Sequence, residues 1–92
     1  MKESDIPNHI MALARNPDLK ATVRLGRNGL TESIIGEIRV QLSARSLVKI
    51  RLNRGFADGG EERSEIFAHL EEQVGAQCIF SRGNVAVLWK RT

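Results

Sequence analysis

The chain has 92 residues, so we expect residues 1–92 to form one domain, with no room for a second. Hydrophobic residues make up 41% of it and charged residues 27%, which is typical of a globular protein and excludes an intrinsically disordered chain. The net charge is +3, and the single cysteine, Cys78, excludes both an intramolecular disulfide and a cysteine-rich zinc site.

The first predicted element is a short helix over residues 9–15, because its apolar residues recur at i, i+3 and i+4. Pro17 ends this helix, since the residue before a proline disfavours helical backbone. Residues 20–25 alternate between apolar and polar side chains, which predicts a strand. The tight loop Gly26-Arg27-Asn28-Gly29 follows.

A second helix is predicted to begin after Thr31, a residue type that caps helix N-termini, and to extend to Arg45. Gly36 lies inside this helix, where glycine costs about 1 kcal/mol relative to alanine. Residues 47–53 are predicted to form the clearest strand, because from Val48 to Asn53 the side chains alternate between apolar and polar. The apolar stripe of the second predicted helix consists of Ile34, Ile35, Ile38 and Leu42.

The second half of the chain begins with a glycine-rich loop that ends at residue 60. A third helix is predicted over residues 60–74, with Gly75 as its C-cap. Its apolar stripe consists of Ile66, Phe67, Leu70 and Val74. Two strands, over residues 76–80 and 85–90, are joined by a hairpin turn at residues 81–84.

The element order αβαβαββ predicts an α/β fold, in the form of a two-layer sandwich on a mixed four-stranded sheet. Strands that are separated by helices are expected to be parallel neighbours joined by right-handed crossovers. The final hairpin adds an antiparallel pair. In this sheet the strands over residues 20–25 and 47–53 are neighbours.

Charge is unevenly distributed along the chain. Eight basic and two acidic residues lie between Lys20 and Arg54, whereas five glutamates and one arginine lie between Gly60 and Gly75. A basic block beside an acidic helix indicates a bipolar surface with one face suited to a polyanion. Ordinary solvated charge is the alternative interpretation.

The loop Gly26-Arg27-Asn28-Gly29 is the motif most informative about function. Its two glycines let the backbone pass close to a ligand or adopt positive φ, and the helix that follows presents a partial positive charge to an anion. Arg27 and Asn28 are suited to contacts with phosphate and sugar oxygens. Taken alone the tetrapeptide is weakly specific, since a plain strand-to-helix turn has the same form. It is neither a Walker loop nor a dinucleotide-binding fingerprint.

Four blocks of the sequence together resemble the CRM family (chloroplast RNA splicing and ribosome maturation domain, or YhbY-like proteins). The first block, Val-Arg-Leu-Gly-Arg-Asn-Gly-Leu-Thr-Glu, is similar to the family signature hydrophobic-x-hydrophobic-Gly-Lys-x-Gly-Leu-Thr. The chain departs from the family pattern where Arg27 replaces a lysine and Trp89 a tyrosine, and its first helix is shorter and less basic. The blocks are residues 23–32, 47–51, 75–77 and 82–90.

This resemblance implies a fold like the C-terminal domain of translation initiation factor three, with a GXXG loop like that of KH domains. It implies RNA as the partner and a role in ribosome (large subunit) assembly or RNA maturation. Single-domain members of the family are found with large-subunit precursors, and multi-domain plant members assist intron splicing. The RNA-binding residues that the resemblance carries over are Gly26, Arg27, Asn28 and Gly29.

Four further basic residues are candidates for RNA contact. Lys49 and Arg51 project from one face of their strand, and Lys20 and Arg24 share this periodicity on the neighbouring strand. The four charges are therefore expected on one face of the sheet, where a polyanion relieves their repulsion. An ordinary solvated sheet face is the alternative.

Other residues have two interpretations each. Arg39 is either an RNA contact or a bystander charge, and Trp89 either packs against the sheet or stacks on a base. Arg82, in the hairpin turn, is expected to be solvated. Cys78 is expected to be a small buried apolar residue.

The sequence favours a binding protein over an enzyme, because no nucleophile or carboxylate pair forms a recognisable motif. His9 and His69 have no partners at ligand spacing, so we expect no metal, no other cofactor and no small-molecule substrate. We expect no signal peptide or membrane span and a monomeric, cytoplasmic protein. A protein-interaction adaptor that uses the acidic helix over residues 60–75 is the alternative function.

Overall fold

The computed structural model describes residues 6–26, 29–53 and 59–90. The order of elements along the chain is the predicted αβαβαββ. The elements are α1 (Asn8–Arg15), β1 (Val23–Leu25), α2 (Glu32–Arg45), β2 (Leu47–Leu52), α3 (Gly60–Val74), β3 (Gln77–Arg82) and β4 (Val85–Trp89).

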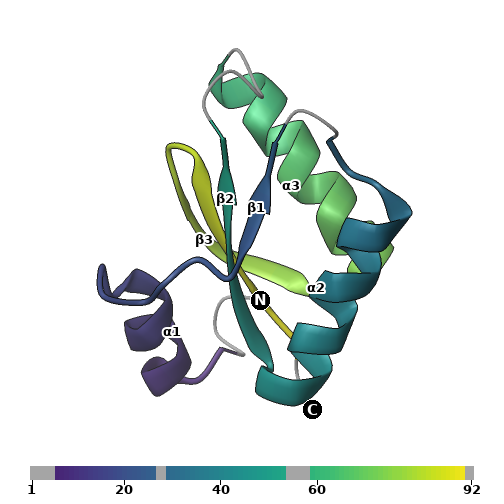
Figure 1. The fold of residues 1–92 in the computed structure, drawn as a ribbon. Helices are drawn as coiled ribbons and strands as arrows, with labels where there is room; N and C mark the ends of the chain where they lie inside the picture. The colour runs from purple at the N-terminus through teal and green to yellow at the C-terminus, as the bar shows by residue number, and fades with distance from the viewer. Residues whose placement is uncertain (1–5, 27–28, 54–58, 91–92) are drawn as a thin grey trace.

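The four strands form one mixed sheet in the order β1-β2-β4-β3, which confirms the predicted fold class (Figure 1). β1 and β2 are parallel neighbours, as expected, and β4 is antiparallel to both β2 and β3. The expectation that strands separated by helices are neighbours is wrong for β2 and β3, because β4 lies between them. β4 is buried from Ala86 to Trp89, and a central position in the sheet lets it bury both of its faces.

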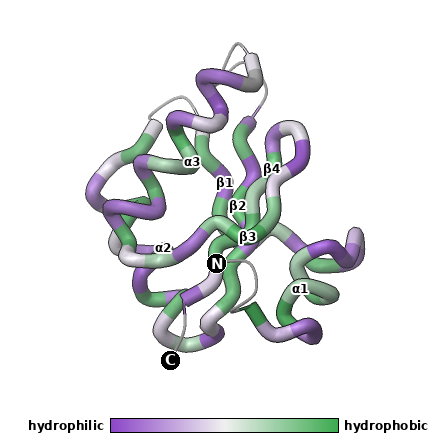
Figure 2. Tube along the Cα trace, turned by 180° about the vertical axis from the view of Figure 1, so that it is seen from behind, coloured by the Kyte–Doolittle hydropathy of each residue, from purple (hydrophilic) through white to green (hydrophobic). Residues whose placement is uncertain are grey.

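The main core lies between one face of the sheet and the helices α2 and α3 (Figure 1). The apolar stripes of both helices face the sheet as their spacing predicts, and Ile38, Leu42 and Leu70 are fully buried. Figure 2 shows largely hydrophobic strands beside helices in which hydrophobic and hydrophilic segments alternate. The strand residues of this core are Val23, Leu25, Val48, Ile50, Leu52, Ala86 and Leu88.

Helix α1 lies on the opposite face of the sheet, where it contacts β3 (Figure 1). Its Ala14 is buried, and Val87 and Trp89 of β4 are buried outside the main core cluster. The sheet therefore has a second, smaller apolar cluster. Because α1 is short, it covers only part of this second face, and the ends of β1 and β2 remain open.

The helix ends follow the predicted capping residues. The Oγ1 of Thr31 accepts a hydrogen bond from the backbone N–H of Ile34, at 3.2 Å. Gly75 ends α3 in the left-handed conformation with φ of 68°. Ser46 ends α2 in the same conformation with φ of 66°, although a serine carries a Cβ that disfavours it.

Two strands differ from the prediction by more than one residue at one end, and the other two are one residue shorter than predicted. β1 begins at Val23 rather than Lys20, because α1 lies over β3 and the chain has to cross the second face of the sheet to reach β1 at the other edge (Figure 1). We call residues 16–21 the crossing segment. β3 extends to Arg82, because Ser81 and Arg82 pair with β4, and this leaves a hairpin loop of only two residues, 83 and 84.

Candidate nucleic-acid interface

Three arginines form a row across the second face of the sheet. Arg24 is the register partner of Arg51, and Val85 is the register partner of both Arg51 and Arg82. Adjacent strands lie about 4.8 Å apart, so this arginine row runs across the strands at the end where β1 and β2 finish. The three side chains are exposed, and no ion pair within the described residues engages them. Their mutual repulsion is unfavourable and would be relieved by a polyanion.

The crossing segment stands beside the arginine row, and together they line two adjoining cavities that share Pro17, Lys49 and Val85. We call the two cavities the basic groove. The first, the cationic half, has a volume of about 310 Å³ and is further lined by Leu19, Lys20, Ala21, Arg24 and Arg51. The second, the apolar half, has a volume of about 220 Å³ and is further lined by Ala14, Arg15, Asn16, Phe80 and Arg82.

The electrostatics of the basic groove are one-sided. Six basic residues line its two halves, and among the described residues no aspartate or glutamate lines either one. Lys49 is half-buried, and its Nζ donates a 2.7 Å hydrogen bond to the carbonyl oxygen of Leu19. A concave surface with charge of one sign focuses its potential, so the groove attracts anions more strongly than scattered surface charges do.

The structure brings together the four basic residues that the sequence singled out. Lys20, Arg24, Lys49 and Arg51 all line the cationic half. Their predicted position on one face of the sheet is confirmed for Arg24, Lys49 and Arg51. It is wrong for Lys20, which lies on the crossing segment and not in β1. Whether they contact RNA stays a prediction.

The loop that follows β1 lies next to the arginine row, since Gly26 is only two residues beyond Arg24. The N–H of Gly29 donates a 2.9 Å hydrogen bond to the carbonyl oxygen of Gly26, and Gly29 has a φ of 70° that favours glycine. A Cβ on Gly26 would lie 2.9 Å from the side-chain nitrogen of Asn53, so this glycine permits a close approach. Arg27 and Asn28 lie outside the described residues.

The N-terminus of α2 contributes less positive charge than the sequence suggested. The Oγ1 of Thr31 accepts a hydrogen bond from one of the free N–H groups of the helix, and Glu32 places a carboxylate in the first turn. Both features offset the partial positive charge of the helix end.

With this geometry in place, the comparison with known families identifies the domain. The model of the CRS1/YhbY (CRM) domain matches residues 10–90. The chain belongs to the CRM domain family. This is an RNA-binding family, and the family expected from the sequence is confirmed.

The CRM fold is also shared with a solved structure. The chain is similar to the solution structure of a hypothetical protein from Staphylococcus aureus that is described as a candidate RNA-binding protein. The TM-score is 0.73 at 21% sequence identity, and the match covers 91% of this chain and 82% of that one. This similarity confirms the α/β fold with a mixed four-stranded sheet.

Two groove residues of this CRM domain were missed by sequence reasoning. Arg82 is exposed, as expected, but it lies in β3 and not in the turn, where it completes the arginine row. Arg15, at the end of α1, lines the apolar half. Residues 80–82 do not alternate between apolar and polar side chains, so no local pattern predicted the longer β3. The position of α1 over β3 had no local signal either.

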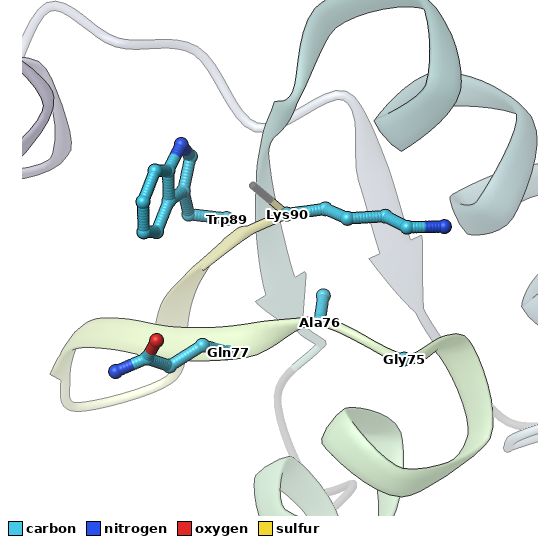
Figure 3. Close-up of a pocket in the computed structure, with 5 residues that line it drawn as sticks. All are labelled: Gly75, Ala76, Gln77, Trp89 and Lys90. Carbon is cyan, nitrogen blue, oxygen red and sulfur yellow. The ribbon is translucent and has the colours of Figure 1, made fainter. Parts of the chain in front are cut away.

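Arg39 and Trp89 have structural roles. The Nε and a terminal nitrogen of Arg39 donate to the carbonyl oxygen of Gln73, which joins α2 to the last turn of α3. Trp89 is only 7% exposed and is the register partner of Gln77. Figure 3 shows Trp89 and Gln77 at a separate cavity, which has a volume of about 260 Å³, with Lys90 extending away from the indole ring. The packing interpretation of Trp89 is therefore favoured over stacking on a base.

Cys78 and the acidic helix are connected by a hydrogen bond. The backbone N–H of Cys78 donates to a carboxylate oxygen of Glu71, at 2.5 Å. Burial, followed by the negative charge of Glu71, raises the pKa of the Cys78 thiol. Cys78 is half-buried against the core, so the expected full burial is only partly met. Glu71 is thus tied to β3, while Glu61, Glu65 and Glu72 are exposed on α3.

Two further observations concern other classes of site. Within residues 6–26, 29–53 and 59–90, no group of three histidine, cysteine, aspartate or glutamate side chains is placed to hold a metal ion. No helix in those ranges combines the length and apolar character that crossing a membrane requires.

Proposed function

We propose that this CRM domain binds RNA along the basic groove, by contacts to backbone phosphates, and that the Gly26–Gly29 loop extends this contact beyond β1. The observation that carries the proposal is the arginine row beside Lys20 and Lys49, with no acidic side chain among the described residues that line the groove. Arginine guanidinium groups form bidentate hydrogen bonds with phosphate, and about half to two-thirds of the hydrogen bonds between proteins and DNA go to phosphate and sugar oxygens.

The biological setting that we propose is assembly of the large ribosomal subunit or another RNA maturation step. Membership of the CRM family supports this setting, and the description of the Staphylococcus aureus protein supports RNA as the partner. Crosslinking in cells, followed by sequencing of the bound RNA, distinguishes ribosomal RNA precursors from introns and transfer RNA. Recovery of no RNA above background would contradict the proposal.

The groove is tested by the salt dependence of binding to a fluorescently labelled oligouridine. For single strands, each phosphate contact contributes about 0.7 to the slope of log K against log salt, so the R24Q/R51Q double variant should lower the slope by about 1.4. The matched control is R45Q/R63Q, which removes the same charge from α2 and α3 on the other side of the sheet. An equal loss of slope in both double variants would mean that net charge, and not the groove, determines binding.

The contribution of the Gly26–Gly29 loop to RNA binding is tested separately. Replacing Arg27 and Asn28 with glutamate places negative charge between the two glycines of the loop sequence without changing either glycine. We expect weaker RNA binding with an unchanged thermal unfolding midpoint. Unchanged affinity would exclude the loop from the binding surface while leaving the groove in place.

A further inference from the structure

The apolar half of the basic groove has a composition that phosphate binding alone does not require. Phe80, Val85 and Pro17 line it together with Ala14, while Arg15 and Arg82 supply positive charge at the same cavity. A surface that contacts only phosphates needs donors and positive charge, as the cationic half provides. An apolar lining with cationic neighbours instead suits a group that is flat, apolar on its faces and attached to phosphates.

We propose that the apolar half holds one unstacked nucleobase of single-stranded RNA, an inference that rests on the proposed RNA binding. The cavity has a volume of about 220 Å³. This is below the range of about 300–1,000 Å³ of clefts that hold drug-sized ligands, so it suits a single base and not a larger ligand. The ring of Phe80, which is half-buried in β3, provides an aromatic surface for the base.

The connection between the two halves determines where the sugar and phosphate of the bound nucleotide lie. Pro17, Lys49 and Val85 line both cavities, so a base in the apolar half has its sugar and phosphate directed into the cationic half. Arg24 and Arg51 then neutralise the phosphate on one side of the base. Arg82 and Arg15 neutralise the phosphate on the other side of the base, which gives these two residues a role in RNA binding.

Asn16 supplies a polar group at the same cavity. Its Oδ1 accepts a 2.9 Å hydrogen bond from the backbone N–H of Asp18, which holds the side-chain amide in one orientation. The amide NH₂ group is then a donor for a carbonyl oxygen on the edge of a base. This arrangement gives the base a hydrogen bond in addition to contact with its face.

The class of RNA follows from this arrangement. Bases inside a duplex are stacked and paired, so their faces cannot enter a side pocket unless the duplex opens. Bases in single strands, loops and bulges are accessible without this cost. The groove should therefore prefer single-stranded RNA, and part of its affinity should come from bases and not from phosphates.

The experiment compares three fluorescently labelled probes of equal length at one salt concentration: oligouridine, an abasic ribose-phosphate strand and an RNA duplex. Base contacts with aromatic side chains are worth enough that wild type should bind oligouridine at least about fivefold more tightly than the abasic strand. The V85W variant fills the apolar half. It should lose this discrimination, so that its affinities for oligouridine and the abasic strand become equal. The ratio of the two affinities is the readout, because Val85 also lines the cationic half.

Val40 provides a matched control, because it lies on α2, on the other side of the sheet, and is 68% exposed. V40W introduces the same residue away from the groove and should keep the wild-type discrimination. Unfolding curves of both variants confirm that they fold. Photocrosslinking of a 4-thiouridine probe should label peptides that contain Phe80 or Pro17 in wild type and lose this labelling in V85W.

The possible outcomes separate the two proposals. Equal affinity of wild type for oligouridine and the abasic strand, or unchanged discrimination in V85W, would overturn the base-binding inference and leave the phosphate-binding groove intact. No binding of wild type to any of the three probes would overturn the proposed function itself, and the inference with it.

Discussion

The ammonium group of Lys49 donates a 2.7 Å hydrogen bond to the backbone carbonyl oxygen of Leu19. This contact joins the middle of β2 to the crossing segment, which lines both halves of the basic groove. Lys49 therefore combines two functions, since it holds one wall of the groove in position and adds positive charge to its interior. Arg24 and Arg51 add charge without such a bond.

Replacing Lys49 with methionine should remove both functions at once, and comparison with a variant that loses only charge separates them. The variant keeps most of the side-chain volume and loses both the hydrogen bond and the charge, so we expect a destabilisation of about 1 kcal/mol and weaker RNA binding. Urea-induced unfolding gives the first quantity and fluorescence anisotropy the second. Amide hydrogen exchange should also become faster in the crossing segment.

The matched control for Lys49 is R24M, which removes a charge from the same cavity but no hydrogen bond to the crossing segment. Its free energy of unfolding should stay within about 0.5 kcal/mol of wild type, as expected for an exposed side chain, while its affinity for RNA falls. Equal stability of K49M and R24M would show that the bond to Leu19 contributes nothing measurable.

Gly29 should be sensitive to replacement by alanine. Its φ of 70° lies in the left-handed region, where a Cβ costs about 1–2 kcal/mol. The same substitution at Gly36 should instead stabilise the protein by about 1 kcal/mol, because this glycine lies inside α2 and a Cβ would meet nothing within 4 Å. Chemical denaturation of the two variants measures both effects, and a stabilised G29A would contradict the turn geometry.

Ser46 provides a further test of left-handed geometry. Because its φ is 66° at the C-terminus of α2, replacement by glycine should relieve strain and stabilise the protein by about 1 kcal/mol. Ser43, which is exposed inside the same helix, should respond in the opposite direction, with a loss of about 0.5 kcal/mol on replacement by glycine. Thermal unfolding midpoints that shift in the same direction would argue against this interpretation.

Cys78 should make stability depend on pH at the alkaline end. Burial and the carboxylate of Glu71 raise the pKa of its thiol above the ordinary value of 9.0. Below that value the thiol is protonated in both the folded and the unfolded state, so its contribution to stability is complete. As the pH rises further, the unfolded chain loses the proton first, and stability decreases until the folded thiol ionises as well.

The measurement for Cys78 is the free energy of unfolding between neutral pH and about pH 9.5, a range that spans the ordinary ionisation of Cys but stays below that of Lys. C78A should show a smaller decrease over this interval than wild type. The raised pKa also predicts slow reaction of the folded protein with iodoacetamide at neutral pH, because the thiolate is the nucleophile. Rapid alkylation of the native protein would contradict the burial of the thiol.

Local features of the fold followed from the sequence alone. The apolar spacing of α2 and α3, the Thr31 cap and the Gly75 terminus are short-range properties that each depend on a few neighbouring residues. The common face of Arg24, Lys49 and Arg51 also followed from strand alternation, once β1 and β2 were expected to pair. These elements reappear in the structure, with differences in strand length that reflect where the chain has to leave the sheet.

The groove itself depended on contacts between distant parts of the chain. Arg82 joins Arg24 and Arg51 only because β4 lies between β2 and β3, and no local pattern determines which strands of a mixed sheet become neighbours. In the same way, α1 lies over β3, and the crossing segment then forms a wall beside the arginine row. Sequence determined which residues are basic and which faces they occupy. Packing of the second face of the sheet, driven by burial of Ala14, Val87 and Trp89, decided that these charges surround a cavity.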